Sequence, residues 1–70
     1  MNWKALLTNL NPGLTQCQIA SKYGVDQSGM GRVFRGVYEP RIETIRAWAA
    51  KEGMQAWEFV KLAEEVSTAP

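Results

Sequence analysis

The sequence predicts an all-α protein, a compact five-helix bundle. Apolar residues recur at helical spacings of three and four along the chain, and no alternation of apolar and polar residues is long enough to predict a strand. Glycine or proline separates the apolar segments and marks where helices should end. A chain of 70 residues can build one hydrophobic core only, so we expect a single domain over residues 1–66 and a frayed tail over residues 67–70.

The first helix is expected over residues 2–10, because four large apolar residues fall on one helical face. They are Trp3, Leu6, Leu7 and Leu10. The Asn-Pro-Gly sequence at 11–13 should end this helix, since proline lacks a backbone donor and glycine tolerates a positive φ.

The clearest helix start in the chain is Thr15, because Gln18 stands three residues later and can complete a capping box. This second helix should end at Gly24, which can adopt the left-handed backbone conformation of a helix terminus. Asp26 is positioned to cap a third helix that ends at Gly36. The inner faces of the two helices would hold Ile19, Ala20, Tyr23, Met30, Val33 and Phe34.

A fourth helix is expected from about Ile42 to Glu52, with Gly53 as its stop. Its buried face would consist of Ile42, Ile45, Trp48 and Ala49. A fifth helix is expected from about Gln55 to Glu65, and its apolar residues occupy more than one face. One face can complete the core, so the other is available for a partner.

Residues 15–36 give the outline of a helix-turn-helix, a unit that places one helix in the major groove of DNA. The exposed side of its second helix would carry glutamine, serine and arginine side chains. Glutamine can bond adenine bidentately, serine can donate or accept, and arginine can bond guanine or phosphate. Gly29 and Gly31 each cost a helix interior about 1 kcal/mol relative to alanine. Two such glycines predict a crowded surface where larger side chains would block close approach.

Charge is divided unevenly along the chain. Residues 1–51 contain seven basic and three acidic residues, a net charge of +4, whereas residues 52–70 contain four acids and one lysine, a net charge of −3. A basic first part is what a nucleic-acid-binding surface requires, and the acidic end would lie away from phosphates.

Over roughly Leu14 to Phe59 the chain resembles the Cro/repressor (Xre-type) family of phage and bacterial regulators. Residues 27–36 read Gln-Ser-Gly-Met-Gly-Arg-Val-Phe-Arg-Gly and are similar to the recognition helix of the phage lambda repressor, whose pattern is Gln-Ser-Gly-Val-Gly-Ala-Leu-Phe-Asn-Gly. The resemblance implies a lambda-repressor-like domain that binds double-stranded DNA sequence-specifically. It further implies a transcriptional regulator, a Cro-like repressor of phage or prophage origin that occupies a palindromic operator.

The resemblance also implies which residues read bases. Gln27 and Ser28 would contact base edges, and Gly31 would lie against a thymine methyl group. Arg32 stands where the lambda pattern has alanine, which adds reach and a preference for guanine or phosphate. The operator sequence therefore cannot be transferred from the lambda system.

Four further residues are expected to contact the DNA backbone. The resemblance places Gln16 against phosphate, where it would also brace Gln27, and puts Arg35 and Arg41 where the family grips the backbone. Arg41 replaces the serine or threonine that caps the fourth helix in many members, which weakens that cap. Among the surface lysines, Lys22 is the one expected to approach DNA.

A homodimer is expected, because one recognition helix makes too few base contacts for useful specificity. Family members bind paired half-sites about one helical turn apart, roughly 34 Å. The candidate contact is the fifth helix, through Trp57, Val60 and Glu64, since Trp57 should point outward while Phe59 points inward. An alternative with the same fold is an antitoxin-like interaction module that binds another protein through this surface, with DNA binding secondary.

Enzymatic, metal-dependent and membrane functions are not expected. The chain has no histidine, no paired-carboxylate site and no glycine-rich phosphate loop, so we predict no catalysis, cofactor, metal or small-molecule substrate. Cys17, expected to be partly buried and inert, is the single cysteine and forms no internal disulfide. No segment has the apolar length of a membrane span or the pattern of a signal peptide, so a cytoplasmic location is expected.

Overall fold

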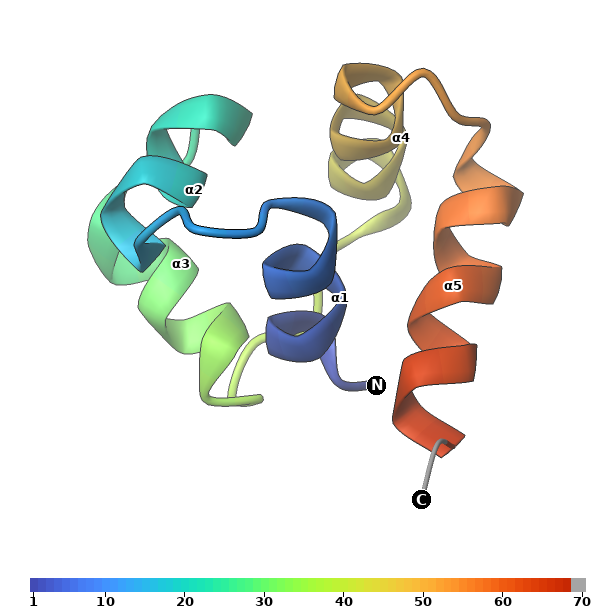
Figure 1. Cartoon of the computed structure of the whole chain (residues 1–70), viewed down its shortest axis with the longest axis horizontal. Helices are drawn as coiled ribbons and strands as arrows, with labels where there is room; N and C mark the ends of the chain where they lie inside the picture. The colour runs from blue at the N-terminus through green and yellow to red at the C-terminus, as the bar shows by residue number, and fades with distance from the viewer. Residues whose placement is uncertain (69–70) are drawn as a thin grey trace.

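The computed structural model describes residues 1–68, and within them the chain forms five helices. These are α1 (Trp3–Leu10), α2 (Gln16–Tyr23), α3 (Gln27–Phe34), α4 (Ile42–Lys51) and α5 (Ala56–Thr68). The described part of the chain contains no strand, which confirms the predicted all-helical class. Figure 1 shows α1 in the middle, with the α2–α3 pair on one side and α4 and α5 on the other.

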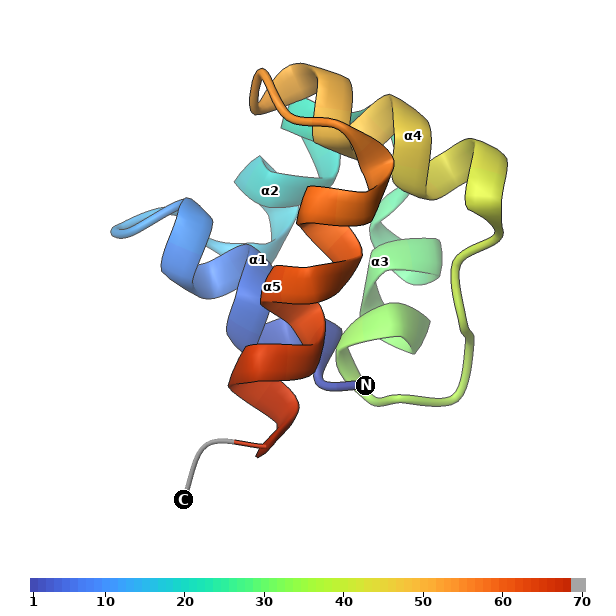
Figure 2. The ribbon, with the colours of Figure 1, turned by 90° about the vertical axis from the view of Figure 1, so that its right-hand side faces the viewer.

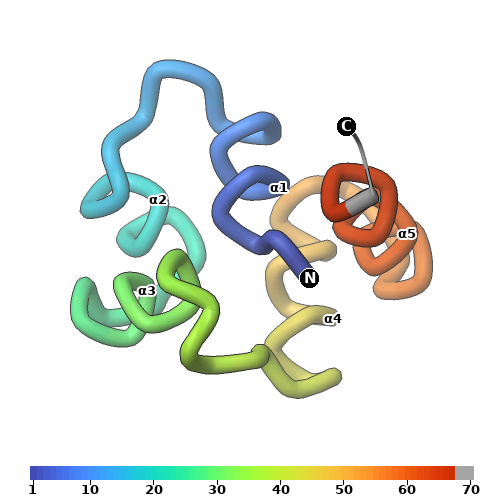
Figure 3. The backbone as a smooth tube through the Cα atoms, turned by 90° about the horizontal axis from the view of Figure 1, so that it is seen from below, coloured from blue at the N-terminus to red at the C-terminus, as the bar shows by residue number. Residues whose placement is uncertain are grey.

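The core is organised around Trp3 of α1, which is 1% exposed. Its ring stacks on Phe59 of α5 at 6.2 Å between centroids and meets Trp48 of α4 edge-on at 6.5 Å. Tyr23 of α2 also contacts Trp48, at 5.6 Å between ring centroids. The α1 helix therefore sits between the α2–α3 pair and α5, as Figure 3 shows.

The predicted helix starts and stops near the candidate site are confirmed. Thr15 and Gln18 form a complete capping box at α2, and Gly24 follows that helix in the left-handed conformation, with φ of 71°. The carboxylate of Asp26 accepts a hydrogen bond from the Gly29 backbone N–H at 2.8 Å and so caps α3.

The fifth helix differs from its expected bounds of 55–65. Gln55 precedes it as a cap: its N–H donates to the Glu58 carboxylate at 3.0 Å and its carbonyl accepts from the N–H groups of Glu58 and Phe59. At the other end α5 continues to Thr68, and the Ser67 hydroxyl donates to the Ala63 carbonyl at 2.8 Å. The predicted tail of residues 67–70 thus begins inside a helix, and residues 69–70 lie outside the described chain.

One residue expected in the core is exposed. Ile42 was predicted to be buried, but its side chain is 49% exposed at the first position of α4. The inward positions of that helix are taken by Ile45, Trp48 and Ala49, because the core ends there and the side chain of Ile42 faces the space between α4 and α5.

The start of α1 lies beside the end of α5. The Asn2 backbone N–H donates to the Ser67 hydroxyl at 2.6 Å, and the Trp3 indole N–H donates to Glu39 at 2.8 Å. Glu39 belongs to the segment 35–41, which runs extended from the end of α3 to the start of α4 (Figure 2). Within residues 1–68, no helix has the length and apolar character needed to cross a membrane.

Candidate nucleic-acid interface

The α2 and α3 helices form a compact unit around a three-residue turn. After Tyr23 the chain reverses at Gly24, where a β-carbon would strain the left-handed backbone. The Val25 N–H then donates to the Ala20 carbonyl at 2.9 Å, which satisfies an acceptor at the end of α2. Asp26 is extended and starts α3 at once, so the angle between the two helices is fixed by three residues.

A shallow hollow on the surface of this unit brings together most of the predicted DNA-contacting residues. It has a volume of about 520 Å³ and is lined by Gln16 from α2, by Gln27, Ser28, Gly31 and Arg32 from α3, and by Arg35, which directly follows α3. The side chains of Gln27 and Ser28 are exposed, and that of Gln16 is half-buried. The hollow therefore presents amide, hydroxyl and guanidinium groups together, with two cations and no carboxylate in its lining.

The floor of the hollow is Gly31, which is buried although it faces the polar surface. A β-carbon added there would lie 3.3 Å from the Gln16 amide nitrogen and 3.7 Å from a guanidinium nitrogen of Arg35. Gln16 and Arg35 thus fold over this glycine from two sides. The crowding predicted from the sequence is present at Gly31, and it comes from the neighbouring side chains of the protein.

Gly29 has a different reason for lacking a side chain. A β-carbon there would lie 2.5 Å from the capping oxygen of Asp26 and 3.3 Å from a methyl of Val25. The carboxylate of Asp26 occupies this space where it accepts from the Gly29 N–H. A side chain at Gly29 would therefore displace the Asp26 carboxylate and crowd Val25.

Lys22, predicted to approach phosphate, is engaged inside the protein. Its ammonium donates to the Glu52 carboxylate and to the Asn11 side-chain carbonyl, each at 2.6 Å, and lies 5.4 Å from the centre of the Tyr23 ring. The side chain is 34% exposed and lies outside the hollow. Its charge is neutralised by Glu52, so the geometry gives no support to a phosphate contact.

Three polar residues that the sequence did not single out surround Lys22. Asn11, which is 4% exposed, donates to the Leu7 carbonyl at 2.8 Å and to the Tyr23 hydroxyl at 3.0 Å. The Tyr23 hydroxyl donates in turn to Glu52 at 2.6 Å. We call Asn11, Lys22, Tyr23 and Glu52 the polar cluster; it joins the α1–α2 turn, α2 and the end of α4.

The polar cluster shifts the pKa values of two of its members. Burial raises the pKa of Tyr23 to about 12, with the hydrogen bond to Glu52 and the charge of Glu52 adding to the effect and the bond from Asn11 opposing it. Burial acts to raise the pKa of Glu52 as well, but the hydrogen bonds from Lys22 and Tyr23 and the charge of Lys22 outweigh it, so that pKa is lowered.

Arg41, the remaining predicted backbone contact, lies apart from the hollow at the start of α4. It is exposed, and no side-chain hydrogen bond caps the helix that follows it. Arg41 and the polar side chains that line the hollow thus remain accessible to an external partner, whereas Lys22 is paired inside the protein.

Sequence reasoning missed a second recess beside the first. It has a volume of about 240 Å³ and lies between α3, the segment 35–41 and α4, with Arg32, Tyr38 and Trp48 among its lining residues. Arg32 lines both hollows and forms the ridge between them. Tyr38, which lines this recess, is 43% exposed. An aromatic residue in the glycine- and proline-flanked segment before α4 was the sequence feature that could have indicated this recess.

Comparison of this chain with models of known protein families, with curated proteins and with solved structures finds no match.

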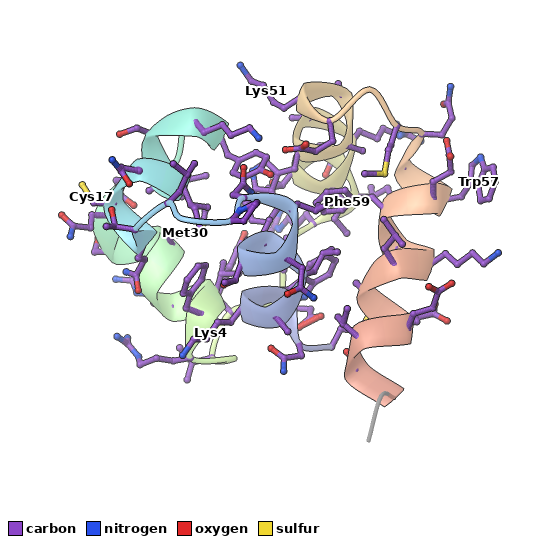
Figure 4. All side chains as sticks on the ribbon, in the orientation of Figure 1. Lys4, Cys17, Met30, Lys51, Trp57 and Phe59 are labelled. Atoms are coloured by element: carbon purple, nitrogen blue, oxygen red, sulfur yellow. The ribbon has the colours of Figure 1, made fainter. Side chains whose placement is uncertain are left out.

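Cys17 was expected to be partly buried but is exposed, because it lies in the first turn of α2 on the side away from the core (Figure 4). In the described part of the chain, no cluster of three or more histidine, cysteine, aspartate or glutamate residues could hold a metal ion.

The predicted interface residues of the fifth helix lie together. Trp57 is 67% exposed and points away from the bundle, whereas Phe59 is fully buried and points into it (Figure 4). Trp57, Val60 and Glu64 line one groove of about 620 Å³ between α4 and α5. The sequence-based division of this helix into an inward and an outward face is confirmed for these two aromatic residues.

Proposed function

We propose that this protein binds double-stranded DNA sequence-specifically through α3 and acts as a transcriptional regulator. The α2–α3 unit would serve as a helix-turn-helix, in which the first residues of α3 enter the major groove. The observation that carries the proposal is the polar hollow, in which Gln16, Gln27, Ser28, Arg32 and Arg35 converge around Gly31.

The residue types at the hollow suit its two kinds of DNA contact. An exposed glutamine and serine at the start of a helix can bond the edges of bases, and an arginine one turn later can reach guanine or phosphate. The capping box holds the start of α2 and the cap at Asp26 holds the start of α3, so the side chains at both helix starts are on fixed backbone. A fixed backbone favours affinity, since less order has to be created on binding.

Within this proposal the protein is a Cro-like repressor of the Cro/repressor (Xre-type) family, active as a homodimer on a palindromic operator in the cytoplasm. The dimer would use the exposed face of α5. Repression would follow from occupancy of the operator, and no catalysis or cofactor takes part.

The test is DNA binding by single variants, after the preferred sequence has been selected from random duplexes. Gln27→Ala and Arg32→Ala should each cost about 1–3 kcal/mol of binding free energy and change the base preferred at one position. Arg35→Ala should weaken binding to all sequences alike and reduce the salt dependence by about one counterion.

Lys22→Gln at moderate salt is the matched comparison, since Lys22 is a cation of the same unit that is paired internally. It should leave the salt dependence of DNA binding unchanged. Equal losses in all three hollow variants, with no change in base preference, would contradict the assigned roles.

The second candidate function is an antitoxin-like interaction module that binds another protein through α5. The exposure of Trp57 favours it, because large exposed aromatic residues are typical of protein interfaces. The two functions differ in the effect of Trp57→Ala. If the unmodified protein binds no duplex DNA and Trp57→Ala abolishes its complex with another protein, the second function is favoured.

A further inference from the structure

The recess between α3, α4 and the segment that joins them has an apolar floor and a polar rim. Trp48 and Val33, each 2% exposed, form the floor on the side of the core. The rim consists of side chains that are exposed or half-buried, those of Arg32, Tyr38 and Thr44. A concave site with apolar walls and a few converging polar groups is the usual form of a small-molecule site.

The floor of the recess is held in place by the core. The Trp48 ring meets Trp3 of α1 edge-on at 6.5 Å and contacts Tyr23 of α2 at 5.6 Å between centroids. Two other helices therefore fix the ring that a ligand would contact. A floor that is already ordered favours binding, because less conformational freedom is lost when the ligand arrives.

The recess suits a ligand with one aromatic ring. Its volume of about 240 Å³ is smaller than the pockets of about 300–1,000 Å³ that hold drug-sized molecules. Trp48 and Tyr38 both line it, so a ring that entered could contact one aromatic side chain at the floor and another at the rim. Offset or edge-to-face contacts between rings add to the free energy gained from burial alone.

The charge at the rim selects an anion. Within residues 1–68 the guanidinium of Arg32 has no hydrogen bond or ion pair, and none of the residues that line the recess is acidic. Glu39, which follows Tyr38, accepts instead from the Trp3 indole N–H at 2.8 Å. A guanidinium can bond both oxygens of a carboxylate, and the Thr44 hydroxyl on the opposite wall is a further donor.

We propose that the recess binds a small monocyclic aromatic carboxylate that regulates DNA binding. The ring of the ligand would contact Trp48 and Tyr38, and its carboxylate would engage Arg32. Arg32 also lines the polar hollow, so a guanidinium that holds the ligand is withdrawn from the surface that would read bases. The regulatory effect rests on the proposed function, whereas binding of the ligand does not.

The test is titration of the full chain with phenylacetate, followed by the indole N–H signals of the tryptophans in nuclear magnetic resonance spectra. The Trp48 signal should shift, and the Trp57 signal should not, because Trp57 lies outside the recess. We expect a dissociation constant of about 0.1–1 mM for this ligand of ten non-hydrogen atoms. Phenylacetamide, which lacks the charge, should bind more weakly, and acetate, which lacks the ring, should leave the Trp48 signal unshifted.

Three variants assign the contacts. Arg32→Gln should raise the dissociation constant of phenylacetate by about 10-fold or more and leave that of phenylacetamide unchanged. Arg35→Gln is the matched control, since Arg35 lines the polar hollow but not the recess, and it should change neither. Tyr38→Ala should weaken both ligands. All three side chains are exposed, so the variants should fold, which circular dichroism checks.

The regulatory effect is measured on the selected duplex DNA. Phenylacetate at ten times its dissociation constant should raise the apparent dissociation constant of DNA by about 10-fold, whereas acetate at the same concentration should leave it unchanged.

An unshifted Trp48 signal overturns the site, as does an equal loss of phenylacetate affinity in Arg32→Gln and Arg35→Gln. Binding of phenylacetate with unchanged DNA affinity overturns the regulation. A protein that binds phenylacetate in the recess but no duplex DNA refutes the proposed function and keeps the site, and one that binds DNA but no phenylacetate does the reverse.

Discussion

Gly31 and Gly29 show that two glycines in one helix can face different neighbours. Gly29 leaves room for the carboxylate that caps α3, and Gly31 leaves room for Gln16 and Arg35 above the helix. The sequence predicts a crowded binding surface at both positions, because the cost of a glycine in a helix does not identify the neighbouring atoms that occupy the space beside it. Those neighbouring atoms are defined only by the packing of α2 on α3.

Gly31→Ala should separate stability from binding. The added methyl group would lie 3.3 Å from the Gln16 amide and so displace it by a few tenths of an ångström. Alanine is a better helix former by about 1 kcal/mol, so the free energy of unfolding should stay the same or rise slightly. DNA affinity should fall, because Gln16 and Arg35 lose their positions over α3. Urea denaturation and DNA titration measure the two effects, and unchanged affinity would contradict the role of the hollow.

The exposure of the residues proposed to face bases could be predicted from the sequence because it depends on local features only. Asp26 caps α3, so Gln27 and Ser28 must be the first exposed positions of that helix. Lys22 could not be assigned in this way. Its partner Glu52 lies thirty positions further along the chain, beyond any helical period, and only the packing of α2 on α4 brings the two together.

At the scale of helices, the polar cluster connects α2 to the end of α4 and makes stability depend on pH. The pKa of Glu52 is lowered in the folded protein, so its contribution is present above its ordinary pKa of 4.5 and is lost as the pH falls through the folded value. The pKa of Tyr23 is raised from 10.0 to about 12, so its contribution is present below pH 10.0 and is lost as the pH rises toward 12.

The free energy of unfolding should therefore be constant at intermediate pH and fall at both ends. Glu52→Gln should reduce the acid fall, and Tyr23→Phe should reduce the alkaline fall, each at a cost of about 1–3 kcal/mol near neutral pH from lost hydrogen bonds to a charged group. Urea denaturation at a series of pH values provides the measurement. If the free energy of unfolding of Tyr23→Phe fell as much at alkaline pH as that of the unmodified protein, groups other than Tyr23 would cause the alkaline fall.

At the start of α4, one substitution should change the free energy of unfolding and the DNA affinity in opposite directions. Arg41 provides no side-chain cap, and serine at this position could accept from the free N–H groups of the first turn. Arg41→Ser should raise the free energy of unfolding by about 0.5–1 kcal/mol. If Arg41 contacts phosphate as proposed, the same change should weaken DNA binding and reduce its salt dependence by about one counterion. Arg41→Ala, which gives no cap, should weaken binding without the gain in stability.

The presence of the helices could be predicted from the sequence. Their ends and faces could be predicted only where capping residues or glycine were present. Thr15, Asp26 and Gly24 set their boundaries by themselves. The end of α5 has no such signal; it is extended by contact with α1, through the bond between Ser67 and Asn2. Ile42 continues the apolar period of α4 past the edge of the core, so periodicity alone placed it inside.

For the whole molecule, stability depends on the aromatic contacts of Trp3. A single core of this size supplies about 3–5 kcal/mol in total. Trp3→Ala removes the stacking on Phe59 and the edge contact with Trp48, which should cost about 3–5 kcal/mol and leave the chain largely unfolded at 25 °C. Trp57→Ala removes the same side chain from the surface and should leave the melting temperature of the monomer unchanged. Thermal unfolding followed by circular dichroism compares the two.

The hydrogen bond between Asn2 and Ser67 joins two residues 65 positions apart and closes the chain into a ring. Because both ends of the described chain meet there, a short glycine linker could join them and new ends could be opened at the exposed Pro12–Gly13 turn. Such a circular permutant would keep every helix contact while making α1 the direct continuation of α5. The α2–α3 unit would then be the first part to leave the ribosome, ahead of the helices that now precede and follow it.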